Sequence, residues 1–186
     1  EKFSIRHPHV HVCLDIQSDD ERIEWMVLEN QGFGIAVSTG RNRNIEKHEL
    51  LGTEAVCLLP VSHRLAANEV ISPEDLVGEN FISYFEGSIF KNDIDKAFNT
   101  AKVRRLTRYE GKTTGAIIGM VGAGLGVSII DSGFGAGSFD PRCITIPFKP
   151  SIPYTAELLW STQRDLSAIQ NEFLNMVREE YGDLDI

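Results

Sequence analysis

Two threonines, Thr113 and Thr114, open an apolar stretch of the chain that extends to Ile130. The pattern predicts a helix that a threonine caps and glycines end, followed by a buried strand at residues 127–130. The first N–H groups of a helix have no partner within it, so together with the threonine hydroxyls they can hold a small anion such as a carboxylate. An ordinary helix cap that binds no ligand is the alternative interpretation.

The glycines of this stretch, Gly122, Gly124 and Gly126, come after the predicted helix and before the predicted strand. In a dinucleotide-binding turn the order is reversed, because the strand comes first and the glycines open the helix. The spacing therefore argues against a nicotinamide or flavin site, and we expect no cofactor.

Potential metal ligands alternate along one predicted strand: His7, His9, His11 and Cys13. Since no further ligand converges on them from a loop, an exposed strand face is a better interpretation than a zinc or copper site. His48 and His63 stand apart from any arrangement of serine, cysteine or aspartate that would make either one a catalytic base. We therefore expect neither a metal site nor an enzyme.

The charge and the cysteine content of the chain limit the classes of protein to which it can belong. The 186 residues include 18 lysines and arginines against 27 aspartates and glutamates, a formal net charge of −9. An acidic surface repels phosphate backbones, so we expect this chain alone not to bind DNA. Its three cysteines are odd in number and far apart, which is typical of reduced thiols in the cytoplasm. No leader is visible, and the glycines and hydroxyls of residues 113–130 argue against a membrane span.

Hydrophobic periodicity and turn residues predict strands that alternate with helices. The predicted strands are residues 10–16, 35–37, 55–59, 81–84, 105–109, 127–130 and 154–160. Predicted helices follow Ser18 or Asp19, Ser72, Thr113 and Ser167, and the clearest amphipathic helix covers residues 90–101. Residues 133–137 and 141–153 are predicted as an irregular connection. This alternation is typical of an α/β protein with a parallel sheet.

Several segments, taken in order, resemble the effector-binding domain of LysR-type transcriptional regulators: residues 7–12, 20–37, 58–66, 71–76, 81–84, 94–98 and 121–127. The most specific match is Val121-Gly-Ala-Gly-Leu-Gly-Val127, and the resemblance covers nearly the whole chain. The family normally has a further strand and loop before its first helix, and a helix-turn-helix domain before that. Glu1 stands only a few residues before Pro8, so we expect those parts to belong to a longer protein.

The resemblance implies an α/β fold of two Rossmann-like lobes joined by crossing strands, like the type II periplasmic binding proteins. Lobe I would comprise residues 1–78 and 152–186, and lobe II residues 79–151. Ligands of open α/β sheets bind at the carboxyl ends of the strands. The residues expected to bind the ligand are therefore Ser83, Tyr84, Glu86, Gly87, Ser88, Thr113, Thr114 and Asp131 from lobe II, with Ser18 and Asp19 from lobe I.

The residue types at these strand ends suggest the ligand. The hydroxyls and the helix N-terminus suit a carboxylate, while Glu86, Asp131 and Asp19 suit a basic group. Asp131 stands where the family usually has proline. A zwitterionic amino acid or an opine-like compound is the first expectation, and an aromatic acid is the alternative.

The expected function is that of an effector sensor. A metabolite in the cleft would shift a homodimer or tetramer between conformations and so modulate DNA binding through a helix-turn-helix domain outside this chain. A free-standing solute-binding protein is the alternative. The sequence upstream of Glu1 distinguishes them, because a regulator has a helix-turn-helix pattern there and an exported binding protein has a signal peptide.

Overall fold

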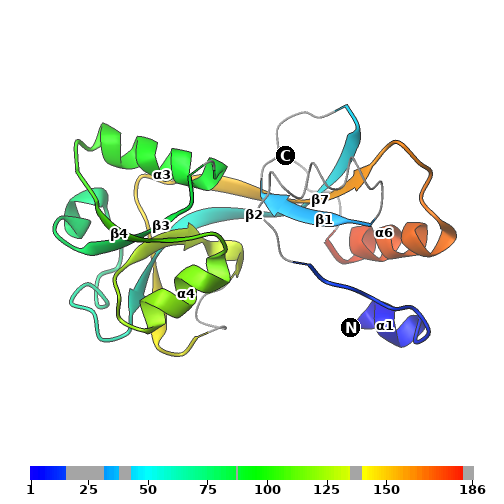
Figure 1. Ribbon diagram of the computed structural model, residues 1–186, viewed down its shortest axis with the longest axis horizontal. Helices are drawn as coiled ribbons and strands as arrows, with labels where there is room; N and C mark the ends of the chain where they lie inside the picture. The colour runs from blue at the N-terminus through cyan, green and yellow to red at the C-terminus, as the bar shows by residue number, and fades with distance from the viewer. Residues whose placement is uncertain (16–31, 38–42, 87, 135–139, 182–186) are drawn as a thin grey trace. The chain divides into compact units, whose positions relative to one another are not determined.

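The computed structural model describes residues 1–15, 32–37, 43–86, 88–134 and 140–181 (Figure 1). It divides into two compact units. Unit 1 comprises Glu1–Gly52 and Thr155–Ile186, and unit 2 comprises Thr53–Tyr154. No helix in the described ranges is long and apolar enough to cross a membrane.

The strands are β1 (Gly34–Val37), β2 (Ile45–Pro60), β3 (Asn80–Tyr84), β4 (Leu106–Gly111), β5 (Ser128–Asp131), β6 (Cys143–Pro147) and β7 (Pro153–Ser161). The helices are α1 (Lys2–Arg6), α3 (Ile89–Thr100), α4 (Thr114–Gly122) and α6 (Ala168–Tyr181), with short 3₁₀ helices η1 (Pro73–Leu76) and η2 (Ser132–Phe134). By their bounds, β2 and β7 each continue from one unit into the other.

Unit 2 contains both parallel and antiparallel strand pairs. β3 and β4 are parallel and are connected through α3, while β5 and β6 both pair with β2 in the antiparallel sense. A parallel bridge between Phe81 and Val127 places the start of β5 beside β3. The carboxyl ends of β3, β4 and β5 therefore lie at one edge of this set of strands. In Figure 1, α3 lies above β3 and β4 and α4 lies below them.

The α-helices α3 and α4 of unit 2 form where the sequence predicts them. α3 buries one face, consisting of Phe90, Ile94, Ala97 and Phe98. Thr113 caps α4 as predicted, because its side chain accepts a hydrogen bond from the amide of Ala116. After α4 the chain passes so close to β3 that a Cβ at residue 126 would lie 2.2 Å from the carbonyl oxygen of Asn80. Only glycine fits at Gly126 without moving the backbone.

Unit 1 joins a strand pair to the C-terminal helix. β1 and β7 are antiparallel, and Leu174 of α6 packs with Leu50, Leu158 and Trp160. The predicted cap of α6 is confirmed, because Ser167 donates its hydroxyl to the Gln170 side chain at 2.8 Å and accepts from the Gln170 amide at 3.4 Å.

The structure corrects several predictions for elements. Residues 10–15 form no strand, and Leu14 is 86% exposed, because no described strand offers this segment a partner for its backbone groups. The region predicted as irregular contains β6, which forms by pairing with β2. The helix predicted after Ser72 is only the short 3₁₀ helix η1. The strand pairs are not all parallel as predicted, since β2 pairs in the antiparallel sense.

The two compact units divide the chain at different positions from the predicted lobes, whose bounds remain a prediction. Residues 53–78 were expected in lobe I but belong to unit 2, because the second half of β2 pairs there with β5 and β6. The helix predicted after Ser18 or Asp19 lies outside the described residues.

Candidate functional site

The end of β3 and the start of α4 meet through a pair of hydroxyls. The Tyr84 side chain is 8% exposed, and its hydroxyl shares a hydrogen bond of 2.9 Å with Oγ1 of Thr114. Tyr84 is in register with Gly111, the last residue of β4. A Cβ at residue 111 would lie 2.7 Å from Cγ1 of Ile117, so Gly111 lets α4 pack closely against the end of this strand. The sequence prediction that these strand ends and the helix start come together is consistent with this geometry.

The N-terminus of α4 offers backbone donors. Thr113 Oγ1 accepts from the Ala116 amide at 3.3 Å, which satisfies one of the first N–H groups of the helix. The amides of Thr114 and Gly115 donate to no acceptor among the described residues. Nothing lies within 4 Å of a Cβ built on Gly115, so a side chain at this residue would meet open space. The helix dipole adds a positive partial charge at the same point, which makes the helix start suitable for an anion.

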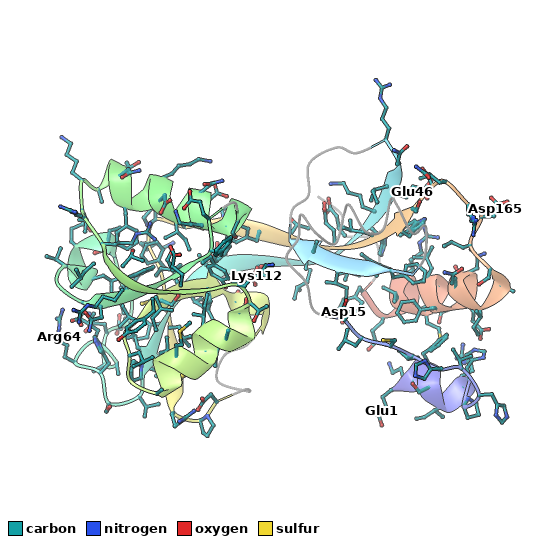
Figure 2. All side chains as sticks on the ribbon, viewed as in Figure 1. Glu1, Asp15, Glu46, Arg64, Lys112 and Asp165 are labelled. Atoms are coloured by element: carbon teal, nitrogen blue, oxygen red, sulfur yellow. The ribbon has the colours of Figure 1, made fainter. Side chains whose placement is uncertain are left out.

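Ser83 lies next to Tyr84 and is buried. It lies at the carboxyl end of β3, in register with Glu110 of β4. Its role as a ligand contact remains a prediction from its place at this strand end. Lys112, labelled in Figure 2, is exposed directly before Thr113 and adds positive charge near the helix start.

Asp131 at the end of β5 is 4% exposed and bonds within unit 2. Its Oδ2 accepts from the Thr53 hydroxyl at 2.8 Å, and its Oδ1 accepts from the Gly133 amide at 2.5 Å. These bonds fasten the end of β5 to β2 and to the following turn. The contribution of Thr53 was missed because β2 was predicted to begin only at Ala55.

Tyr154 is a second residue that sequence reasoning did not place in the site. Its side chain is 4% exposed, and its ring lies 4.4 Å from that of Phe90, which in turn lies 5.0 Å from the ring of Tyr84. Burial, followed by the charges of Asp93 and Asp131, raises the pKa of the Tyr154 phenol above its ordinary value. The group is therefore a neutral donor at physiological pH. A tyrosine in a strand is usually a core residue, so the sequence carried no signal for this position.

The remaining predicted residues are less enclosed. Glu86 is 79% exposed and pairs with Nζ of Lys91 at 2.9 Å. Ser88 precedes α3 but makes no cap bond with its side chain. The predicted ligand-binding residues Gly87, Ser18 and Asp19 lie outside the described residues.

Histidines, acids and cysteines are other residue types that could bind a metal or act as a nucleophile. Among the described residues, no group of three or more histidines, cysteines or acids could hold a metal. Nε2 of His7 instead lies 2.9 Å from a carboxylate oxygen of Glu172. Burial raises the pKa of the Cys57 thiol, which keeps it protonated and unreactive at neutral pH.

Unit 1 has a hollow of about 540 Å³ at the start of α6. Its lining residues are Gly32, Ser161, Arg164, Asp165, Leu166, Ser167, Ile169 and Gln170. The hydroxyl of Ser161 accepts from the Gln163 amide, and the hydroxyl of Ser167 donates to the side-chain oxygen of Gln170. The described residues that were predicted at strand ends lie in unit 2, which carries the candidate site.

Comparison with known sequences identifies related proteins. The LysR substrate binding domain family matches residues 1–182. The transcriptional activator protein LysR of Escherichia coli (strain K12) is 27% identical over 173 residues, which cover 93% of this chain and 56% of the activator. The regulatory protein NocR of Agrobacterium tumefaciens (strain T37) is 28% identical over 174 residues, covering 93% of this chain and 58% of NocR. The chain thus spans a little over half the length of these relatives.

Solved structures agree on the fold. The regulatory domain of CcmR from Synechocystis PCC6803, in complex with 2-PG, aligns with a TM-score of 0.83 at 18% identity, covering 98% of this chain and 89% of that domain. The effector binding domain of QuiR, in complex with shikimate, aligns with a TM-score of 0.77 at 16% identity, covering 97% and 87%. The predicted α/β fold of the type II periplasmic-binding-protein kind is confirmed. From the sequence match over residues 1–182, the chain belongs to the LysR substrate-binding domain family.

Proposed function

We propose that this chain is the effector-sensing domain of a transcriptional regulator and that unit 2 binds a carboxylate of the effector. The observation that carries the proposal is the pair of amides at Thr114 and Gly115, which have no acceptor among the described residues. Hydrogen bonds to a charged acceptor are worth roughly 1.5–3 kcal/mol each. A few such bonds support binding of a small acid.

An amino acid or opine-like compound remains the first choice of effector. Glu86 is exposed and offers a carboxylate for a basic group. Asp131 contributes less than expected, because both its oxygens already accept hydrogen bonds within unit 2. The aromatic row of Tyr84, Phe90 and Tyr154 favours an aromatic acid as the second candidate.

In the full protein, effector binding would modulate transcription through a helix-turn-helix domain outside this chain. The full protein would be cytoplasmic and would form a dimer or a tetramer. The relatives named above are regulators of greater length, which supports this proposal. The net charge of −9 supports the further expectation that the chain alone does not shift DNA in a gel at physiological salt. A salt-sensitive gel shift by the isolated chain would contradict that expectation.

The test is a thermal-shift panel of amino acids, opines and aromatic acids, since a ligand that binds only the native state raises Tm. The strongest binder is then measured by calorimetry. Ser83→Ala and Thr114→Ala should each weaken binding by about tenfold or more, the equivalent of one charge-assisted bond. Thr107→Ala is the matched control, because Thr107 is an exposed hydroxyl at the other end of β4. Unchanged affinity in both site variants would show that these hydroxyls are only structural.

A further inference from the structure

The hydroxyl of Tyr154 is buried and has no hydrogen-bond partner among the residues that the structure describes. A buried phenol normally donates to an acceptor, so a buried phenol without an acceptor lowers the stability of the folded state. His7, Asp95 and Arg105 also carry such an atom, but each of these side chains takes part in an ion pair. No ion pair or hydrogen bond is seen for the Tyr154 hydroxyl within the described residues.

A series of contacts connects Tyr154, whose hydroxyl has no partner among the described residues, to the proposed carboxylate site. The Tyr154 ring contacts Phe90, the Phe90 ring contacts Tyr84, and the Tyr84 hydroxyl bonds to Thr114 at the start of α4. All of these residues belong to unit 2. The carboxylates of Asp93 and Asp131 are near enough to act on the phenol. A second anionic group on a ligand would be repelled there, whereas a neutral oxygen would not.

We propose that Tyr154 selects the effector by donating its hydroxyl to a second, neutral oxygen of an acid whose carboxylate binds at the N-terminus of α4. This inference rests on the proposed function of the same site. The preferred ligand class is an acid with a hydroxyl or carbonyl group. An analogue that lacks this oxygen leaves the phenol unsatisfied and binds more weakly.

Contact with Tyr154 also requires movement. The hydroxyl oxygen is closed to solvent in the ligand-free structure, so an acceptor reaches it only after neighbouring side chains shift. Binding of the correct ligand is therefore coupled to a change in packing of unit 2. A sensor needs such a difference in interaction between its two conformations.

The test compares Tyr154→Phe with Tyr84→Phe, which removes the same atom from a tyrosine whose hydroxyl has a partner. Without ligand, Tyr154→Phe should melt at or above the wild-type Tm, because no hydrogen bond is lost, while Tyr84→Phe should melt below it. A role of Tyr154 in holding the fold would lower both. Equal loss of Tm in the two variants would therefore overturn the proposal.

Calorimetry with matched acids supplies the second readout. The pairs are L-homoserine and L-2-aminobutyrate, shikimate and 1-cyclohexenecarboxylate, and 4-hydroxybenzoate and benzoate. The wild type should prefer the hydroxylated member of the pair it binds by about tenfold, and Tyr154→Phe should bind both members equally, with affinity for the deoxy acid unchanged. A preference that survives in Tyr154→Phe, or none in the wild type, overturns the role of Tyr154 alone. Binding of no acid from these pairs or from the thermal-shift panel overturns the proposed function as well.

Discussion

Polar groups at the two ends of the parallel β3–β4 pair differ in whether they have partners within the described protein. Before β4, the Arg105 guanidinium lies 4.8 Å from the ring centre of Phe81 and 4.9 Å from that of Phe98, and it pairs with Asp95. At the carboxyl end, the amides of Thr114 and Gly115 have no acceptor in the described chain. At the first end, the buried cation is held by a carboxylate and two aromatic rings of the protein itself. The second leaves donors for a ligand.

Arg105 has a side-chain exposure of only 12%, and burial lowers its pKa without neutralising it. Lys91, near the start of α3, is also largely buried and lies 2.9 Å from carboxylate oxygens of both Asp95 and Glu86. The comparison leads us to expect a larger stability effect at Arg105 and effector binding, as proposed, at the start of α4.

The largest effect is expected at Arg105. Arg105→Ala removes a largely buried cation that pairs with Asp95 and lies over two aromatic rings, so it should lower the free energy of unfolding by about 3 kcal/mol. Effector affinity should stay at the wild-type value. Denaturant unfolding measures the first quantity and calorimetry the second. Arg104→Ala is the control, since Arg104 is exposed and should change stability by less than about 0.5 kcal/mol. If Arg105→Ala and Arg104→Ala lose a comparable free energy of unfolding, the expected difference between the two strand ends is wrong.

The next effect concerns the anchor of β5. Thr53→Val deletes the hydroxyl that donates to buried Asp131 and should cost about 2 kcal/mol, within the range for bonds to charged groups. Thr53→Ser keeps the donor and should restore most of that stability. If valine is tolerated as well as serine in thermal unfolding, Asp131 does not depend on Thr53 and is open to a ligand's basic group.

The cap of α4 should give a smaller effect. Thr113→Ala removes the bond from the Ala116 amide and should cost about 1 kcal/mol of stability. Thr113→Ser should retain it. Because the cap also orders the helix start, the alanine variant should bind the effector more weakly, whereas Arg105→Ala should not. Calorimetry that finds full affinity in Thr113→Ala would show that the helix start does not bind the ligand.

The smallest effect depends on pH and lies beyond the C-terminus of α4. Asp140 accepts hydrogen bonds from the side chain and amide of Arg142, which lower its pKa to about 2. A depressed pKa stabilises the fold above the ordinary value near 3.8, and this contribution is lost as the pH falls towards 2. The Tm difference between wild type and Asp140→Asn should therefore be present at pH 6 and vanish near pH 2. A difference that persists at pH 2 would point to packing rather than charge.

Local patterns predicted the elements that carry the site. The spacing of Phe90, Ile94 and Phe98 predicted α3, and the threonine cap with trailing glycines predicted α4, because both signals lie within a few turns of the chain. The length of β2 was not predictable in the same way. It runs from Ile45 to Pro60 through exposed and buried positions, since its pairing partners come from distant segments.

The same contrast between local patterns and long-range pairing applies to the candidate site. The rule that parallel strands share a carboxyl edge brought Ser83, Tyr84 and Thr114 together from the sequence alone. Tyr154 and Thr53 were missed because they reach this edge from β7 and from the chain of β2, through pairing that no local pattern encodes. The predicted ligand role of Asp131 remains a prediction, and the structure shows partners that the sequence could not reveal.

The most direct test of the central claim is a ¹⁵N amide titration with the strongest binder from the acid panel. Amide resonances of Thr114 and Gly115 should show the largest shifts, with Ser83 close behind, and all should saturate with one affinity. The methyl ester of the same acid should produce none of these shifts, because it lacks the negative charge. Shifts concentrated in unit 1, around Arg164 and Ser167, or equal binding of the ester, would contradict a carboxylate site at the start of α4.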